Sequence, residues 1–387
     1  MLTVICVFFS FLVVAFASMY LPRKDGMYFQ ALSCCLILGV FFCCRDLPVL
    51  NDTAHYYEHL YHLISKASFD GRSIFEVNPR ERFEYGFCVW ENFIAKYIWK
   101  DAYSIVFITA LINTLFYVWY IKKYTPTRIA ISCFLLFGFF LSVYSGLRQA
   151  YAIILFLIAF DRLLAKKWVQ YYALVSLAYL FHSSAIILFF FPIATLFKAS
   201  KRNVCIFLLG SCVVAVLIYP ILQMLDYSDS VYYSSNLQRE KMPLAAIIEL
   251  LWGVFIVGLI LYVRKRYSIK GRPMLVEWSL AILISCRIIG VFFLIFRRFG
   301  WYWDIFSVLE LVYLCTYAKS KYRLQPPFGK IKTCDNKVNP DMILGLVIFL
   351  FSIKMILTFV LKNEWNHLIP YGFYDFAPGF HKCRFGY

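Results

Sequence analysis

The chain has 387 residues, of which 62% are hydrophobic and only 16% are charged, and its formal net charge is +17. A soluble domain is roughly 45–50% apolar and about 25% charged, so this composition excludes a soluble globular enzyme. The positive charge does not indicate nucleic-acid binding, because Lys and Arg of multi-span proteins collect in cytoplasmic loops. We therefore predict one membrane domain over residues 1–387, with no nucleic-acid partner.

Twelve apolar runs follow one another along the chain, and each is predicted to form a membrane-spanning helix. They cover about 1–20, 28–44, 101–121, 127–145, 147–164, 168–182, 184–198, 203–224, 243–263, 274–296, 303–318 and 341–361. The predicted fold is all-α, a polytopic transmembrane helix bundle of about 12 spans. The sixth and seventh runs are short and weakly separated, so we expect one of them to be re-entrant or broken.

The loops between these runs alternate in charge. Basic residues gather in one set, which is therefore predicted to be cytoplasmic. This set contains Arg23, Lys24, Lys122, Lys123, Lys166, Lys167, Lys201, Arg202, Arg264, Lys265, Arg266 and the stretch 319–337. The other set, 45–100, 225–242 and the tail from residue 362, is predicted to face outward. Both termini are then extracytoplasmic, and 45–100 is a large extracytoplasmic loop.

Several polar side chains fall within the spans or at their predicted outer ends. They are Arg148, His182, Arg287, Arg297 and Arg298. A charge inside the bilayer costs several kcal/mol unless it is paired or hydrated, so each needs a reason. An arginine at a helix end often reaches the headgroups, and a histidine there is often structural. Arg287 is about three helical turns deeper, at ~1.5 Å per residue, and its ordinary explanation is an ion pair with Glu249, Asp304 or Glu310.

A lipid-linked pyrophosphate is a ligand that suits such arginines. The arginine fork matches phosphate and stays charged in every environment. Two arginines can stabilise the charge of a departing pyrophosphate without a metal, and a histidine can take a proton from an attacking sugar hydroxyl.

The predicted outer loop interleaves aromatic rings with Asp, Glu and Asn, a mixture that suits carbohydrate. Asn51, Asp52, Thr53 and Tyr57 lie near its start, and Glu84 follows later. Asp52 and Glu84 are also possible bases. An ordinary structured loop with interfacial aromatic residues is the alternative explanation.

The order of these short motifs resembles the EpsG family, the Wzy-like polymerases of bacterial polysaccharides. The matching residues are Asn51, Asp52, Thr53 and Tyr57, then Glu84 and Gly86, then Arg148 and Gln149, and finally His182, Ser184 and Ala185. The resemblance runs along most of the chain, although each motif is short. The late arginines are included by position alone.

The resemblance implies a GT-C-like glycosyltransferase of the cytoplasmic (inner) membrane. It would move a growing glycan from undecaprenyl pyrophosphate to a lipid-linked repeat unit, inverting the anomeric carbon, without cofactor or metal. We assign pyrophosphate binding to Arg148, with Arg287, Arg297 or Arg298 as the second cation. Acceptor activation is assigned first to His182, then to Asp52 and Glu84, and glycan binding to Asn51, Thr53, Tyr57 and Gln149. Lipid-linked oligosaccharides, membrane lipid and a chain-length regulator are the expected partners.

Two other functions fit the same composition. A lipid-linked oligosaccharide flippase would also have about twelve spans, but its charges would be spread through the bundle core. A metal-dependent GT-C transferase using a polyprenyl-phosphate sugar would need a carboxylate pair in the first outer loop. There Arg45-Asp46 and Asn51-Asp52 each offer one acid.

Overall fold

Helices make up the regular structure of the chain in the computed structural model. The model describes residues 2–50, 52–77, 83–125, 130–131, 139–224, 243–266, 273–293, 295–317, 345–350, 352–353 and 373–376. Within these ranges every regular element is helical, and a single β-bridge joins Arg45 to Phe373. The chain divides into two compact units. Unit 1 is Met1–Phe160, Trp168–Ala185 and Gly345–Tyr387, and unit 2 is Asp161–Lys167 and Ile186–Leu344.

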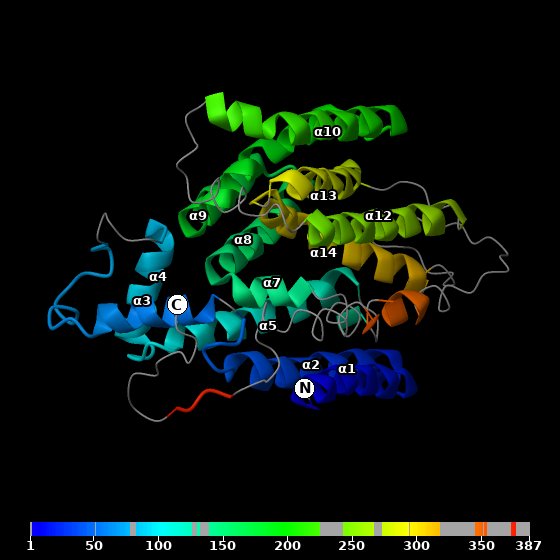
Figure 1. The fold of residues 1–387 in the computed structure, drawn as a ribbon. Helices are drawn as coiled ribbons and strands as arrows, with labels where there is room; N and C mark the ends of the chain where they lie inside the picture. Colours follow the sequence, from blue (N-terminus) through cyan, green and yellow to red (C-terminus); the bar gives the residue numbers. More distant parts are fainter. Residues whose placement is uncertain are drawn as a thin grey trace. The chain divides into compact units, whose positions relative to one another are not determined.

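Unit 1 begins with two antiparallel apolar helices that lie side by side (Figure 1). The helices assigned to it, in chain order, are α1 (Leu2–Tyr20), α2 (Arg23–Leu38), a short π-helix η1 (Gly39–Cys43), α3 (Thr53–Ile64), α4 (Tyr85–Tyr97), α5 (Ser104–Tyr124), α7 (Phe139–Ser145), α8 (Leu147–Leu164) and α9 (Trp168–Phe181). α2 and η1 both pack on α5. The last turn of α8 already belongs to unit 2.

The segment 45–100, predicted as an outer loop, contains two helices of its own. Tyr57, Leu60 and Leu63 recur along α3 at helical spacing and are buried. Together with Phe87 and Ile94 of α4 they form one hydrophobic cluster with the start of α5. This apolar period explains why the segment folds as packed helices and not as an irregular loop. Its extracytoplasmic location stays a prediction.

The C-terminal residues 373–376, which we name the strap, return to unit 1. The backbone N–H of Tyr374 donates to the carbonyl of Cys44 at 2.9 Å. Its ring stacks on Tyr103, with the centroids 3.8 Å apart and the planes 9° apart. Phe376 stacks on Trp99 in the same way, at 6.4 Å. The strap therefore joins the C-terminal part of the chain to the turn after η1 and to the start of α5.

Replacing Tyr374 by alanine is expected to destabilise unit 1 by about 3 kcal/mol, the typical cost of truncating a buried aromatic ring. Tyr374 is only 7% exposed, whereas Phe376 is half exposed. Phe376→Ala is therefore the control and should cost much less. Thermal unfolding of both variants in detergent measures the difference. Equal unfolding temperatures for Tyr374→Ala and the unaltered protein would show that the strap does not stabilise unit 1.

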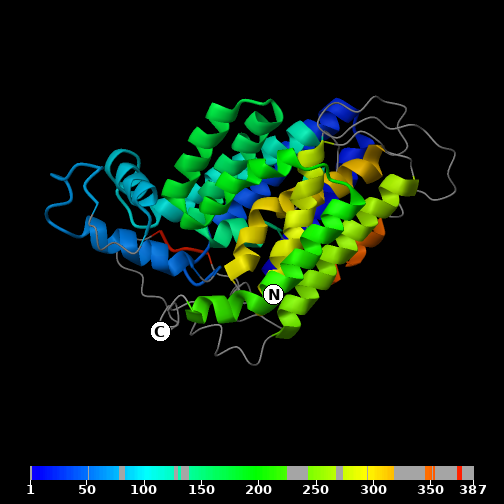
Figure 2. The ribbon, with the colours of Figure 1, turned by 90° about the horizontal axis from the view of Figure 1, so that it is seen from above.

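Unit 2 contains most of the 3-10 helix η2 (Ser183–Leu196), then α10 (Lys201–Met224), α12 (Pro243–Arg266), α13 (Met274–Phe292) and α14 (Ile295–Tyr317). α12, α13 and α14 lie side by side (Figures 1 and 2). α10 runs parallel to α13, since Phe207 packs on Trp278 and Ser211 bonds Ser285 at 2.6 Å. η2 contains Pro192 and is a continuous 3-10 helix, not an α-helix, so a broken or re-entrant segment in the sixth or seventh run stays a prediction.

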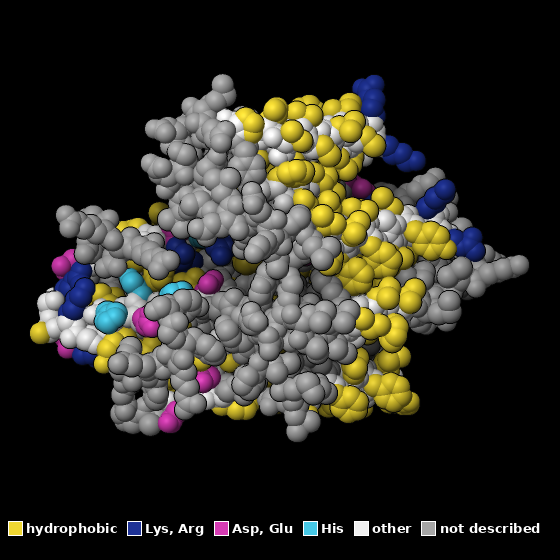
Figure 3. Space-filling model, viewed as in Figure 1, with side chains coloured by type: hydrophobic (Ala, Val, Ile, Leu, Met, Phe, Trp, Pro, Cys, Tyr) yellow, Lys and Arg dark blue, Asp and Glu magenta, His cyan; other side chains and the backbone are white. Residues whose placement is uncertain are grey.

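The basic residues of α10 and α12 lie at one end of unit 2. Lys201 and Arg202 begin α10, and Arg264 near the end of α12 forms an ion pair with Glu277 in the first turn of α13. Since α10 and α13 are parallel, these charges share one end, where Figure 3 shows Lys and Arg beyond a surface of hydrophobic side chains. Positive charge at a single end fits the predicted cytoplasmic loops.

Five helices in the described part of the chain are long and apolar enough to cross a membrane. They are Lys24–Cys43, Ser104–Tyr124, Lys201–Ile218, Ala246–Arg266 and Met274–Phe292. Shorter apolar helices cover Phe9–Tyr20, Trp168–Phe181 and Ser183–Leu196. About half of the predicted run 127–145 and most of 341–361 fall outside the described residues. Twelve spans, one membrane domain and the orientation of the termini therefore stay predictions.

Candidate functional site

Three of the predicted site residues meet in unit 1, although 98 positions separate the first from the last. Glu84 precedes α4, Arg148 is in the first turn of α8, and His182 joins α9 to η2. One carboxylate oxygen of Glu84 lies 3.0 Å from His182 Nδ1, and the other forms an ion pair with Arg148 Nη1. The backbone N–H of Ser183 also donates to the first oxygen, at 3.0 Å. Glu84 is thus the centre of the group.

A glycine explains why Glu84 reaches His182. Gly86, in the first turn of α4, lies against the end of α9. A Cβ added there would come within 2.8 Å of both the Cβ and the carbonyl oxygen of Leu180. Real Cβ atoms do not approach so closely, so only glycine permits this contact of α4 with α9. The Glu-x-Gly pattern therefore supplies both the carboxylate of Glu84 and the glycine that lets α4 approach α9 closely enough for Glu84 to reach His182.

Two aromatic residues complete the surroundings of Arg148. The guanidinium carbon lies 4.6 Å from the centre of the Phe83 ring, a cation–π distance. The hydroxyl of Tyr56, on α3, accepts a hydrogen bond from Arg148 as well. Both residues belong to the aromatic residues of the predicted outer loop, whose mixture with Asp, Glu and Asn indicates carbohydrate binding. Their contact with Arg148 is not predicted by the sequence.

Glu84 stays ionised at all ordinary pH values. Burial acts to raise its pKa, but the hydrogen bond to His182, the charge of Arg148 and the N–H of Ser183 outweigh burial and lower the pKa from 4.5 to about 2. Because the folded pKa is the lower one, these contacts stabilise the fold fully above about pH 4.5, and that stability is lost as the pH falls toward 2.

An ionised Glu84 fixes the proton on the neighbouring ring. A carboxylate only accepts hydrogen bonds, so Nδ1 of His182 carries the proton that it donates to Glu84. The Nε2 atom of a neutral His182 is then an acceptor. A carboxylate with so low a pKa is a poor proton acceptor near neutral pH, so this geometry gives Glu84 a positioning role beside His182.

The other predicted residues of unit 1 lie around this group or in its support. Asp52 immediately precedes α3, close enough for its charge to act on Tyr56. Thr53 is fully buried, and its hydroxyl accepts from Arg45 Nε at 3.2 Å. Tyr57 and Gln149 are also buried. Asn51 lies outside the described residues. Glycan binding by Asn51, Thr53, Tyr57 and Gln149 stays a prediction, and burial of the last three makes direct sugar contact there difficult.

A second group of charges lies within unit 2. Arg287 of α13 donates to Asp304 Oδ1 of α14 and to the backbone carbonyl of Glu249 of α12, both at 2.6 Å. Arg297 forms two bonds to the Glu249 carboxylate, of which Nε to Oε2 is 2.8 Å. Of the three acids proposed as partners for Arg287, the structure confirms Asp304. Arg298 is exposed.

The helix boundaries correct the sequence prediction that Arg297 and Arg298 close the run 274–296. α13 ends at Phe292, because Phe293 is extended with φ −131° and ψ 105°. α14 then begins at Ile295, well before the predicted 303. Both arginines therefore lie in the first turns of α14. Hydropathy does not reveal the break between α13 and α14, because the residues on both sides of it are apolar.

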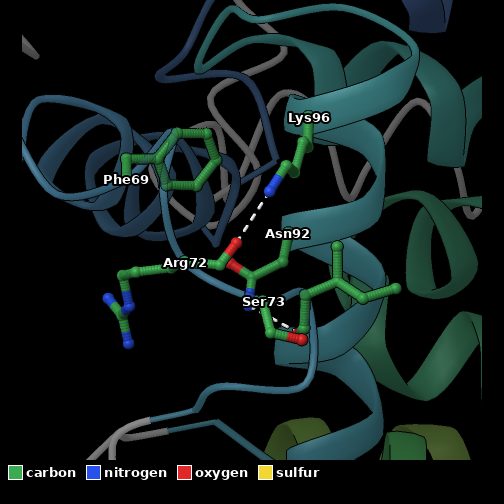
Figure 4. Close-up of a pocket in the computed structure, with 6 residues that line it drawn as sticks. Phe69, Arg72, Ser73, Asn92 and Lys96 are labelled. Carbon is green, nitrogen blue, oxygen red and sulfur yellow. Dashed lines mark hydrogen bonds between the residues drawn. The ribbon is translucent and has the colours of Figure 1, made fainter.

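A small cavity near α4 has a structural explanation (Figure 4). It is lined by Phe69, Arg72, Ser73, Ile74, Asn92 and Lys96 and has a volume of about 10 Å³. This volume is barely enough for one water molecule and far too small for a sugar. Lys96 Nζ donates to the carbonyl of Arg72 at 2.7 Å, and Asn92 Nδ2 to that of Ile74 at 2.9 Å. These bonds fasten the segment before Glu84 to α4.

The apolar helices and the charged groups among them define an integral membrane protein with polar sites of its own. A model of the EpsG family matches residues 28–373. The chain therefore belongs to the EpsG family, the family of Wzy-like polysaccharide polymerases, as the sequence motifs predicted. Neither curated proteins nor solved structures gave a match. The GT-C-like architecture thus stays a prediction.

Proposed function

We propose that this protein is a glycosyltransferase that polymerises polysaccharide at the outer face of the cytoplasmic membrane. The donor is a growing glycan on undecaprenyl pyrophosphate, and the acceptor is a repeat unit on the same lipid. Membership of the EpsG family supports a polymerase of polysaccharide biosynthesis. The observation that carries the mechanism is the contact of Glu84 with both His182 and Arg148.

In this mechanism Nε2 of His182 takes the proton from the acceptor hydroxyl. The hydroxyl oxygen attacks the anomeric carbon of the donor sugar, the bond from that carbon to the pyrophosphate breaks, and undecaprenyl pyrophosphate leaves. Attack opposite the leaving group inverts the anomeric configuration. Glu84 holds the ring and stabilises its positive charge after the proton transfer.

Arg148 is the cation proposed to face the developing charge of the pyrophosphate. Its pair with Glu84 uses Nη1 and a further hydrogen bond goes to Tyr56, but a guanidinium has five N–H groups, so these two bonds do not use up its directional donors. Arg287, Arg297 and Arg298 are the proposed sources of the second cation. Because arginine supplies this positive charge, the reaction is proposed to need no metal. Asp52 is the alternative base.

Purified protein in detergent, supplied with a lipid-pyrophosphate-linked repeat unit and EDTA, tests the proposal. We expect a ladder of multimers on a gel, with polyprenyl pyrophosphate released as each linkage forms. A ladder that appears only after Mg²⁺ or Mn²⁺ is added would indicate the metal-dependent transferase. Intact substrate with well-folded protein would contradict the polymerase, and transfer of the lipid across reconstituted vesicles would then test the flippase.

A further inference from the structure

The charges of unit 2 tie three helices together at the end opposite their basic residues. Glu249 lies in the second turn of α12, whereas Arg264 and its neighbours end that helix. Arg287 joins α13 to α12 and α14, and Arg297 joins α14 to α12. Two arginines thus face two carboxylates among apolar helices, and the four charges sum to zero.

Two glycines make room for these arginines. A Cβ on Gly253 would lie 2.8 Å from Cδ of Arg287, and a Cβ on Gly290 would lie 2.6 Å from Cγ of Arg297. Each arginine stem therefore packs into a space that only glycine leaves open. Each stem therefore lies directly against the backbone of a neighbouring helix, which narrows the range of positions open to its guanidinium group.

The two carboxylates differ in how firmly they are held. The Asp304 side chain is 19% exposed, whereas that of Glu249 is 36% exposed, the most open of the four. Glutamate also has one more rotatable bond than aspartate. Arg287 keeps a second bond, to the backbone carbonyl of Glu249, which does not depend on any carboxylate. Arg297 is the arginine whose bound carboxylate can leave most easily.

We infer that Glu249 is an exchangeable counter-ion, which occupies Arg297 until the diphosphate of a polyprenyl lipid displaces it. Its two bonds to Arg297 have the fork geometry in which arginine also binds phosphate oxygens. The inference rests on the proposed function for the identity of the lipid. It adds that Glu249 opposes binding, so that the site is electrically neutral without substrate and releases its product readily.

The test is the affinity of the purified protein for inorganic pyrophosphate and for undecaprenyl pyrophosphate, measured by calorimetry or by thermal shift. Glu249→Gln removes the competing charge while keeping the size of the side chain. We expect it to bind both diphosphates about tenfold more tightly, because the ligand no longer displaces a charged hydrogen-bonding partner. Undecaprenyl monophosphate should gain less. If undecaprenyl pyrophosphate binds more tightly than inorganic pyrophosphate, the diphosphate that displaces Glu249 is that of the lipid.

Glu277→Gln is the matched control. It breaks the Arg264–Glu277 pair, which also ties α12 to a neighbouring helix, but to α13 and at the basic end, whereas Glu249 pairs with Arg297 of α14. That variant should lose stability without gaining affinity for pyrophosphate. Arg297→Gln should abolish the gain when combined with Glu249→Gln. If Glu249→Gln does not fold, Glu249→Asp keeps the charge but shortens the reach to Arg297, and it should show a smaller gain in affinity.

Unchanged or weaker pyrophosphate binding by Glu249→Gln would overturn the inference, as would an equal gain in Glu277→Gln. Binding is measured without acceptor, so the result does not depend on polymer formation. A polymer ladder without any pyrophosphate binding would leave the proposed function standing and remove this inference. Tighter diphosphate binding by Glu249→Gln without a polymer ladder would support this inference and contradict the proposed function.

Discussion

Glu84→Gln is expected to lower the rate of polymerisation by about 10²–10⁴-fold, the usual contribution of a positioned acid–base group. Glutamine has the size of glutamate, but its neutral amide no longer stabilises a protonated His182. The amide also offers a donor where Arg148 and Nδ1 of His182 both need an acceptor. The loss should fall mainly on kcat, because the proton transfer occurs during the chemical step.

The rate of this variant must be compared with that of Glu76→Gln. Glu76 lies in the same unit and also pairs with an arginine, Arg72, but its side chain is 58% exposed. That surface pair should contribute little, so its variant should polymerise normally. Initial rates on a synthetic lipid-linked repeat unit give both values. Normal kcat for Glu84→Gln would remove His182 positioning from the mechanism.

The pH dependence of the polymerisation rate below neutral pH is an independent check on the positioning role of Glu84. With a pKa of about 2, the carboxylate of Glu84 does not titrate between pH 5 and 8. A fall in activity within this window therefore cannot arise from protonation of Glu84. Initial rates of the unaltered protein from pH 5 to 8 give the profile, in which any fall belongs to a group other than Glu84.

Gly86→Ala is expected to destabilise the protein by about 1–3 kcal/mol and to abolish polymerisation. The added Cβ meets the carbonyl oxygen of Leu180 at 2.8 Å, and a backbone atom cannot move aside as a flexible side chain can. α4 must then separate from α9, which withdraws Glu84 from His182. Thermal unfolding and polymerisation of the same preparation measure both effects.

Gly39→Ala is the control, because this glycine also lies in helical backbone, with φ −58°, and a Cβ there meets nothing within 4 Å. Alanine is the better helix former, so the variant should be as stable as the unaltered protein or slightly more so. Full activity of Gly86→Ala would contradict the close contact of α4 with α9.

The sequence predicted the helices better than their ends. The run 243–263 corresponds to α12 (Pro243–Arg266) and 101–121 to α5 (Ser104–Tyr124), since each is apolar enough for the membrane. The break at Phe293 was missed because the residues around it are apolar whether or not the helix continues. The sequence predicts a loop over 45–100 because the helices of this segment are amphipathic and too short to span a membrane.

The sequence predicts three residues of the candidate site but not the contacts between them. Glu84, Arg148 and His182 stand in short motifs, and their order along the chain selected them. Their mutual contacts span 64 and 98 positions, and no local pattern encodes such a pairing. Arg45 was not identified, although it is fully buried and donates to Phe42, Tyr144 and Thr53. Burial of this kind arises from tertiary packing and has no periodic signature.

The geometry of η2 sets how far fourteen residues can reach. A 3-10 helix rises ~2.0 Å per residue, so Ser183–Leu196 extends over about 28 Å, whereas the same residues would cover about 21 Å as an α-helix. The hydrocarbon core of a bilayer is about 30 Å thick. The tighter winding therefore gives a segment that is too short for an ordinary span nearly the full depth of the membrane. With three residues per turn, every third side chain, from Ile186 through Phe189 to Pro192, lies in one straight row along it.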